Sequence, residues 1–179
     1  VAAAKEKGNL KASTNGNKAS NHTAAQLLAK SAGFKYKAIP YGGTADQLLA
    51  LRQGEVDFTC AKVADVAKLV KGDKPELRVL AVFNTKRDPE LPNVPTLGEK
   101  GLYPEWYGSA RALVAPKGTK PEVIQYYVEA FKKTMQDPAV IEAHKKAGMA
   151  LDFKDNKELG DLIKAQDKFA RDVVNDLYK

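Results

Sequence analysis

The sequence has few of the residues on which several classes of site depend. It contains one cysteine, Cys60, in 179 residues, which excludes an intrachain disulfide and a cysteine-based zinc framework. Its two histidines, His22 and His144, lie far apart, and neither has a metal ligand at helical spacing. It also lacks the G-x-G-x-x-G fingerprint of dinucleotide-binding loops and the G-K-S/T ending of Walker loops. We therefore expect no metal and no cofactor.

Long apolar runs and clustered positive charge are also missing. No stretch approaches 18 consecutive apolar residues, so no membrane-spanning helix is predicted. The opening residues, VAAAKEKGN, lack the apolar region of a signal peptide, although a mature exported chain would already have lost that peptide. The net charge is +7, but the lysines are scattered rather than gathered in a block. This pattern favours a solvated basic surface that attracts small anions, and it predicts no nucleic-acid partner.

Short β-favouring segments alternate with amphipathic helical patterns along most of the chain. This alternation predicts an α/β fold with a mostly parallel sheet flanked by helices. The predicted strands cover residues 11–13, 34–39, 56–60, 77–83 and 107–115. The predicted helices cover residues 21–32, 45–53, 63–70, 119–136, 138–148 and 156–176. Predicted helix N-caps are Ser20, Thr44 and Asn156, and Gly33 is predicted to end the first of these helices.

Two stretches share a design that points to a binding site. In LKASTNGNKASNHTAAQ (Leu10–Gln26) and in IPYGGTAD (Ile39–Asp46), a β-favouring run ends in small polar residues and glycine before a helix. Backbone N–H groups at a helix N-terminus are unpaired within the helix, and the helix dipole favours an anion there. Ligands of such sheets bind at the carboxyl ends of the strands. The pattern predicts a carboxylate site, while simple tight turns remain the alternative.

Three segments resemble a known family when taken together and in this order. They are IPYGGTADQLLALRQGEVDF (Ile39–Phe58), LRVLAVFNTKRDPELPNVPTLGEKG (Leu77–Gly101) and LVAPKGTKPEV (Leu113–Val123). The chain is similar to the Bug (TctC) family, the periplasmic solute-binding receptors of tripartite tricarboxylate transporters. The resemblance implies a Venus flytrap of the type II periplasmic-binding kind. It implies that residues 8–111 form its second, ligand-binding lobe, and that residues 112–179 form the C-terminal crossover and helices that pack on a first lobe. About 100 preceding residues would then be absent.

The resemblance also implies which residues face the ligand. They are Ser13, Thr14, Asn15, Gly16, Ser20, Tyr41, Gly42 and Gly43. Three positions depart from the family pattern. Cys60-Ala61-Lys62 stands where the family often has an acidic residue, Ala110 stands where it often has tryptophan, and Asn17-Lys18 makes the first loop more basic. If Lys62 or Lys18 points inward, the pocket favours a di- or tri-anion. The alternative is that both lysines are solvated.

From this resemblance we expect a periplasmic protein that captures a small organic carboxylate and delivers it to membrane permease subunits. One alternative is a receptor domain that signals to a membrane sensor. An α/β enzyme is a weaker alternative, because no aspartate pairs with a histidine and no nucleophile stands beside a base in the sequence pattern. The helices that follow residue 119 have more apolar surface than a small sheet needs, which raises self-association as a further expectation.

Overall fold

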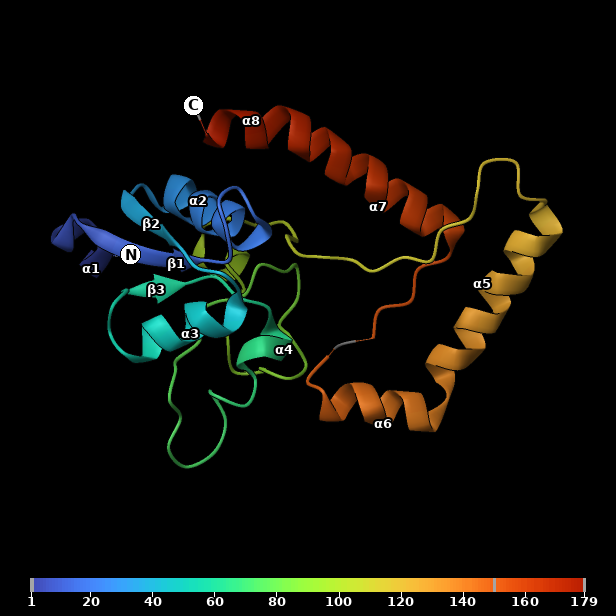
Figure 1. Cartoon of the computed structure of the whole chain (residues 1–179), viewed down its shortest axis with the longest axis horizontal. Coiled ribbons are helices and arrows are strands. Elements are labelled where there is room, and N and C mark those ends of the chain that lie inside the picture. The colour runs from blue at the N-terminus through green and yellow to red at the C-terminus, as the bar shows by residue number, and fades with distance from the viewer. Residues whose placement is uncertain (1, 150, 179) are drawn as a thin grey trace. The chain divides into compact units, whose positions relative to one another are not determined.

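The structure is a computed structural model that describes residues 2–149 and 151–178, and it contains two compact units (Figure 1). The first unit extends to Ser109 and the second begins at Ala110. The elements of the first unit are α1 (Ala2–Lys7), β1 (Leu10–Thr14), α2 (Ser20–Ala32), β2 (Tyr36–Pro40), α3 (Thr44–Arg52), β3 (Phe58–Thr59), α4 (Val63–Val66) and the 3₁₀ helix η1 (Gly98–Lys100). Those of the second are α5 (Pro121–Gln136), α6 (Pro138–Lys146), α7 (Asn156–Phe169), the π-helical turn η2 (Ala170–Val174) and α8 (Asn175–Leu177).

A three-stranded parallel sheet with the order β2-β1-β3 forms the centre of the first unit. The central strand β1 pairs along its whole length with β2, from Leu10 opposite Tyr36 to Thr14 opposite Pro40. It pairs more briefly with β3, where Ser13 lies opposite Thr59. The predicted α/β fold with a parallel sheet is confirmed.

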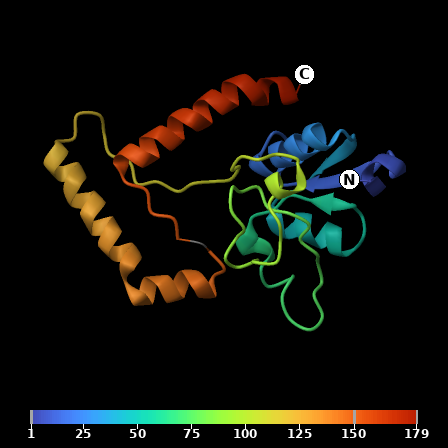
Figure 2. The same cartoon turned by 180° about the vertical axis from the view of Figure 1, so that it is seen from behind.

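Helices α2 and α3 cover opposite sides of this sheet, as both views show (Figures 1 and 2). The buried face of α2 is built mainly from alanines and Leu27, and that of α3 from Leu48 and Ala50. Such small side chains let a helix lie close to a sheet. Gly33 ends α2 as predicted, because its φ of 68° is left-handed, a conformation that glycine adopts without steric cost.

Two predicted strands are wrong. Residues 77–83 form no strand, and the only bridge in this segment pairs Val82 with Thr96. Residues 107–115 are irregular as well. The apolar pattern of LRVLAVF is compatible with a strand, but a strand also needs a neighbour with which to form its ladder. No other described strand lies against residues 77–81, and Leu80 is 68% exposed.

The predicted N-caps are also wrong. Ala19 and Gly43 occupy the N-cap positions of α2 and α3, one residue before the predicted Ser20 and Thr44, and no side chain caps either helix. Asp155, not Asn156, caps α7, and it forms a capping box with Glu158. Pattern alone could not place these ends, because one residue decides whether a hydroxyl reaches the free N–H groups.

The second unit has strongly amphipathic helices but no buried residue among those described. Large apolar side chains of α5, α6 and α7 are exposed, including Tyr126 (70%) and Phe131 (48%). An apolar helical face normally packs against another element. The helices of this unit therefore carry a face that its own described residues do not cover.

Candidate functional site

The carboxyl ends of the three strands meet at one edge of the sheet. Thr14 ends β1, and its carbonyl oxygen accepts a 2.8 Å hydrogen bond from the N–H of Tyr41, the residue after β2. Beside Ser13, strand β3 ends at Thr59, whose hydroxyl donates to the Ser13 carbonyl at 3.0 Å. The structure thus brings Ser13, Thr14 and Tyr41 together, as the sequence suggested.

The order β2-β1-β3 places a topological switch point at β1. The connection from β1 passes through α2 to β2, and the connection from β2 passes through α3 to β3 on the other side of β1. These two helices lie on opposite sides of the sheet (Figure 2). Loops that leave a sheet in opposite directions open a crevice outside the strand ends, where ligands of open α/β sheets bind.

The N-terminus of α2 is favourable for an anion. The helix has 13 residues, no acidic residue in its first turn and no side-chain cap at Ala19. The preceding loop contains Gly16 at φ 125° and Lys18 at φ 57°, so the chain turns sharply before the helix. Because the first N–H groups of a helix have no intrahelical acceptor, they are available to a ligand.

The N-terminus of α3 differs in charge. Its N-cap, Gly43, has extended backbone and also lacks a side-chain cap, but Asp46 lies in the first turn. A methyl group on Gly42 would lie 3.5 Å from Oδ2 of Asp46, so this carboxylate is beside the glycine loop. The negative charge of Asp46 already complements the dipole of α3. Of the two helix ends, that of α2 is therefore the better carboxylate site.

A buried network of polar groups connects the strand ends at this edge to α2 and α3. Gln47 of α3 is 0% exposed, and its side-chain nitrogen donates to the carbonyls of Ser13 (3.1 Å) and Cys60 (2.9 Å) and to the hydroxyl of Thr59. Its side-chain oxygen accepts from Nδ2 of Asn21 in α2 at 2.9 Å. The Ser13 hydroxyl donates to the Gln47 backbone carbonyl at 3.0 Å. Sequence reasoning missed Asn21 and Gln47; polar residues within the apolar faces of two helices were the available indication.

Two buried polar atoms at the edge have no hydrogen-bond partner among the described residues. They are the hydroxyl oxygen of Thr14, which is 1% exposed, and the side-chain oxygen of Asn15. Buried polar atoms in proteins are nearly always hydrogen-bonded, so each unpaired one calls for an explanation. Both residues belong to the segment that the family resemblance assigned to the ligand.

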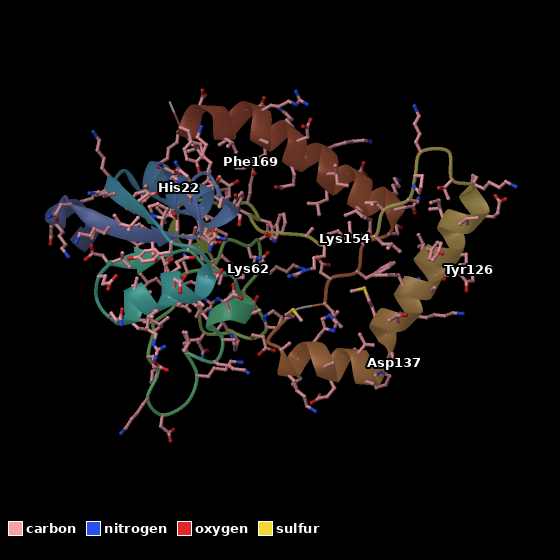
Figure 3. The ribbon with its side chains drawn as sticks, in the orientation of Figure 1. His22, Lys62, Tyr126, Asp137, Lys154 and Phe169 are labelled. Carbon is pink, nitrogen blue, oxygen red and sulfur yellow. The ribbon has the colours of Figure 1, made fainter. Side chains whose placement is uncertain are left out.

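The remaining candidate residues lie around the same edge with less distinctive surroundings. Ser20 and Gly16 are partly exposed, and the Tyr41 hydroxyl donates to Glu55 at 3.1 Å. Lys62 is exposed at the start of the four-residue helix α4 (Figure 3). Cys60 is partly exposed, and burial of its thiol raises the pKa to about 12. At neutral pH it is therefore protonated and a poor nucleophile.

Within residues 2–149 and 151–178, no three histidine, cysteine, aspartate or glutamate side chains lie close enough to hold a metal ion. No helix in these ranges is both long and apolar enough to cross a membrane.

Comparison with known protein families shows to which family the chain belongs. The model of the tripartite tricarboxylate transporter family receptor, TctC, matches residues 1–177. The chain belongs to this family. A UPF0065 protein from the gbd 5' region of Cupriavidus necator is 38% identical over 117 residues, which are 65% of this chain and 35% of that protein. Protein BugT of Bordetella pertussis is 32% identical over 123 residues, which are 68% of this chain and 37% of BugT.

Solved structures with the same fold include that of a TctC protein. A TctC solute-binding protein from Polaromonas superposes with a TM-score of 0.84 at 27% identity, covering 98% of this chain and 59% of that one. An R. palustris protein with adipate superposes with a TM-score of 0.77 at 22% identity, and the match covers 95% of this chain and 58% of that one. MatC from Rhodopseudomonas palustris with bound malate superposes with a TM-score of 0.61 at 24% identity, and the match covers 78% of this chain and 47% of that one. The family is one of solute-binding receptors rather than enzymes. The chain spans 35–37% of the two relatives and about half of the solved chains.

Proposed function

We propose that the carboxyl edge of the β2-β1-β3 sheet binds one carboxylate of a small organic acid, as part of a periplasmic receptor for a tripartite transporter. The observation that carries this proposal is the uncapped N-terminus of α2 beside the buried, unpaired hydroxyl of Thr14. A carboxylate at this position would accept from the first N–H groups of α2 and from Thr14. Hydrogen bonds to a charged group contribute about 1.5–3 kcal/mol each.

Two relatives of the same fold support a carboxylate as the ligand class. The solved R. palustris proteins hold adipate and malate, and both are dicarboxylates. One carboxylate would occupy the edge of this lobe, and the other would be held by a second lobe that closes over it. Closure removes the ligand from water, which strengthens each charge-assisted hydrogen bond. The closed receptor would then dock on the permease subunits of the transporter.

The second unit fits the role of a segment that packs on another lobe. Its helices expose apolar faces, and the Polaromonas chain is longer than the region matched here. We assign residues 112–179 to the crossover and to helices whose apolar faces a first lobe covers, and residues 8–111 to the ligand-binding lobe. Self-association of the uncovered helices is the alternative way to bury the same surface.

Substitution of Thr14 tests the proposed site in the full-length receptor. Thr14→Val removes the hydroxyl and keeps the shape of the side chain. The hydroxyl has no partner in the described structure, so the free energy of unfolding should stay equal or rise. The dissociation constant for the bound carboxylate should rise about tenfold, which corresponds to roughly 1.4 kcal/mol.

Calorimetric titration with adipate, malate, citrate and acetate would measure this effect. Phosphate, a nucleotide and an oligonucleotide serve as controls for charge alone. Thr96→Val is the matched variant, because Thr96 is buried (3% exposed) and its hydroxyl accepts from the N–H of Glu99 in a different part of the first unit. It should lower stability and leave affinity unchanged. A Thr14→Val receptor that binds these acids as tightly as the wild type would refute the site.

A further inference from the structure

The hydrogen bond between Asn21 and Gln47 joins two helices that lie on opposite sides of one sheet. Asn21 is the second residue of α2, and Gln47 is the fourth residue of α3. Asn21 Nδ2 donates to Gln47 Oε1 at 2.9 Å, and the two residues are 6% and 0% exposed. Helices on opposite sides of a sheet cannot touch through it, so this contact passes around the ends of the strands.

We propose that Asn21 and Gln47 are positioning residues that hold the two helix N-termini in one fixed arrangement for the ligand. This inference rests on the proposed function of the same edge. Gln47 also donates to carbonyls of Ser13 and Cys60, at the ends of β1 and β3. One side chain therefore fixes both strand ends and, through Asn21, the start of α2.

The chemistry of the amide explains why a glutamine suits this position. Its nitrogen has two donor hydrogens and its oxygen is an acceptor, so it satisfies carbonyls on one side and a donor on the other. Neither residue needs to contact the ligand. A buried network of hydrogen bonds makes a local arrangement more rigid. Rigid donors bind an anion better, because no ordering entropy is lost on binding.

The test separates positioning from stability. Asn21→Leu keeps a side chain of similar size and removes the donor, and Gln47→Met breaks the same bond from the other helix. Both are made in the full-length receptor and compared with Thr96→Val. Affinity for adipate and malate is measured well below the melting temperature, where circular dichroism shows every variant to be folded. Lower global stability does not change affinity there, because nearly all molecules are still native.

We expect Asn21→Leu to weaken binding of the acid by about tenfold or more, with Thr96→Val unchanged. The double variant should bind no more weakly than the weaker single variant, because the Asn21–Gln47 bond that Asn21→Leu removes is among the bonds that Gln47→Met removes. Binding by Asn21→Leu within about twofold of the wild type, or fully additive losses, would overturn the proposal.

A second measurement needs no ligand. Amide hydrogen exchange of residues 41–46 should accelerate in Asn21→Leu, although the substitution lies in α2, and should not change in Thr96→Val. If the wild type binds neither acid, the proposed function fails for these acids and the exchange data alone decide the positioning role. Unchanged exchange in residues 41–46 would overturn that role in either case.

Discussion

The N–H of Lys18 donates a 3.0 Å hydrogen bond to Nδ1 of His22. This bond closes the loop before α2, in which Lys18 has a left-handed backbone at φ 57°. His22 is 6% exposed, and burial lowers its pKa below the usual 6.5. The neutral imidazole is therefore the form that holds the proposed binding loop, since a protonated Nδ1 cannot accept.

Acid should weaken this loop. The pKa of His22 is lower in the folded than in the unfolded state. The contribution of neutral His22 to stability is therefore fully present above about pH 6.5 and is lost as the pH falls through the folded pKa. His22→Asn keeps an acceptor and does not titrate. The free energy of unfolding, measured with urea between pH 7.5 and pH 5, should fall more steeply for the wild type than for the variant. Parallel pH profiles would contradict the role of His22.

Gly43→Val should abolish binding and leave the fold nearly intact. Gly43 has extended backbone with φ −176°, and an added Cβ would meet no atom within 4 Å, so stability should change by about 0.5 kcal/mol or less. The bulky side chain would cover the N–H groups at the start of α3. Calorimetry with adipate and malate measures the loss, and Gly160→Ala, also without a close neighbour, is the control. Retained affinity would remove this loop from the site.

Lys18→Gly should affect stability and affinity in opposite directions. A non-glycine residue in the left-handed region costs roughly 1–2 kcal/mol, and glycine removes this cost at some expense in chain entropy, so a net gain of about 0.5–1 kcal/mol is expected. Loss of the charge should weaken dicarboxylate binding, and more at low than at high salt. Lys18→Asn tolerates the same backbone and isolates the charge effect. Equal affinity at low salt would show that the charge of Lys18 does not contribute to binding.

Cys60 should react slowly with thiol reagents in the folded protein. Burial raises its pKa to about 12, which lowers the thiolate fraction near pH 8. Modification by a disulfide reagent should be roughly 100-fold slower in the native protein than in urea. Fast labelling of the native chain would show that the thiol is accessible and ionised.

The apolar face of α5 should be buried in the full-length receptor. Tyr127 and Phe131 are 51% and 48% exposed in this chain. If a first lobe covers them, Phe131→Ser should lower stability by about 2 kcal/mol or more there, while the exposed Lys132→Ser should change it by less than about 0.5 kcal/mol. Urea unfolding of both variants measures this. Light scattering of residues 1–179 alone tests the alternative of self-association.

The sequence by itself determined the parallel α/β class and the two glycine-containing loops. Alternating strand and helix patterns are local, and so are the glycine-containing segments that follow β1 and β2. For the same reason Gly33 was recognisable as the end of α2, since only its own backbone conformation matters there. The family could also be recognised, because its motifs are contiguous segments.

Only the tertiary structure decided which residues support the site. Asn21 and Gln47 are 26 positions apart, and nothing local to either shows that they meet beyond the strand ends. Residues 77–83 have the pattern of a strand, yet a ladder depends on a neighbour elsewhere in the chain. Local patterns indicate which helices and strands can form, and long-range packing and hydrogen bonding decide which of them do form.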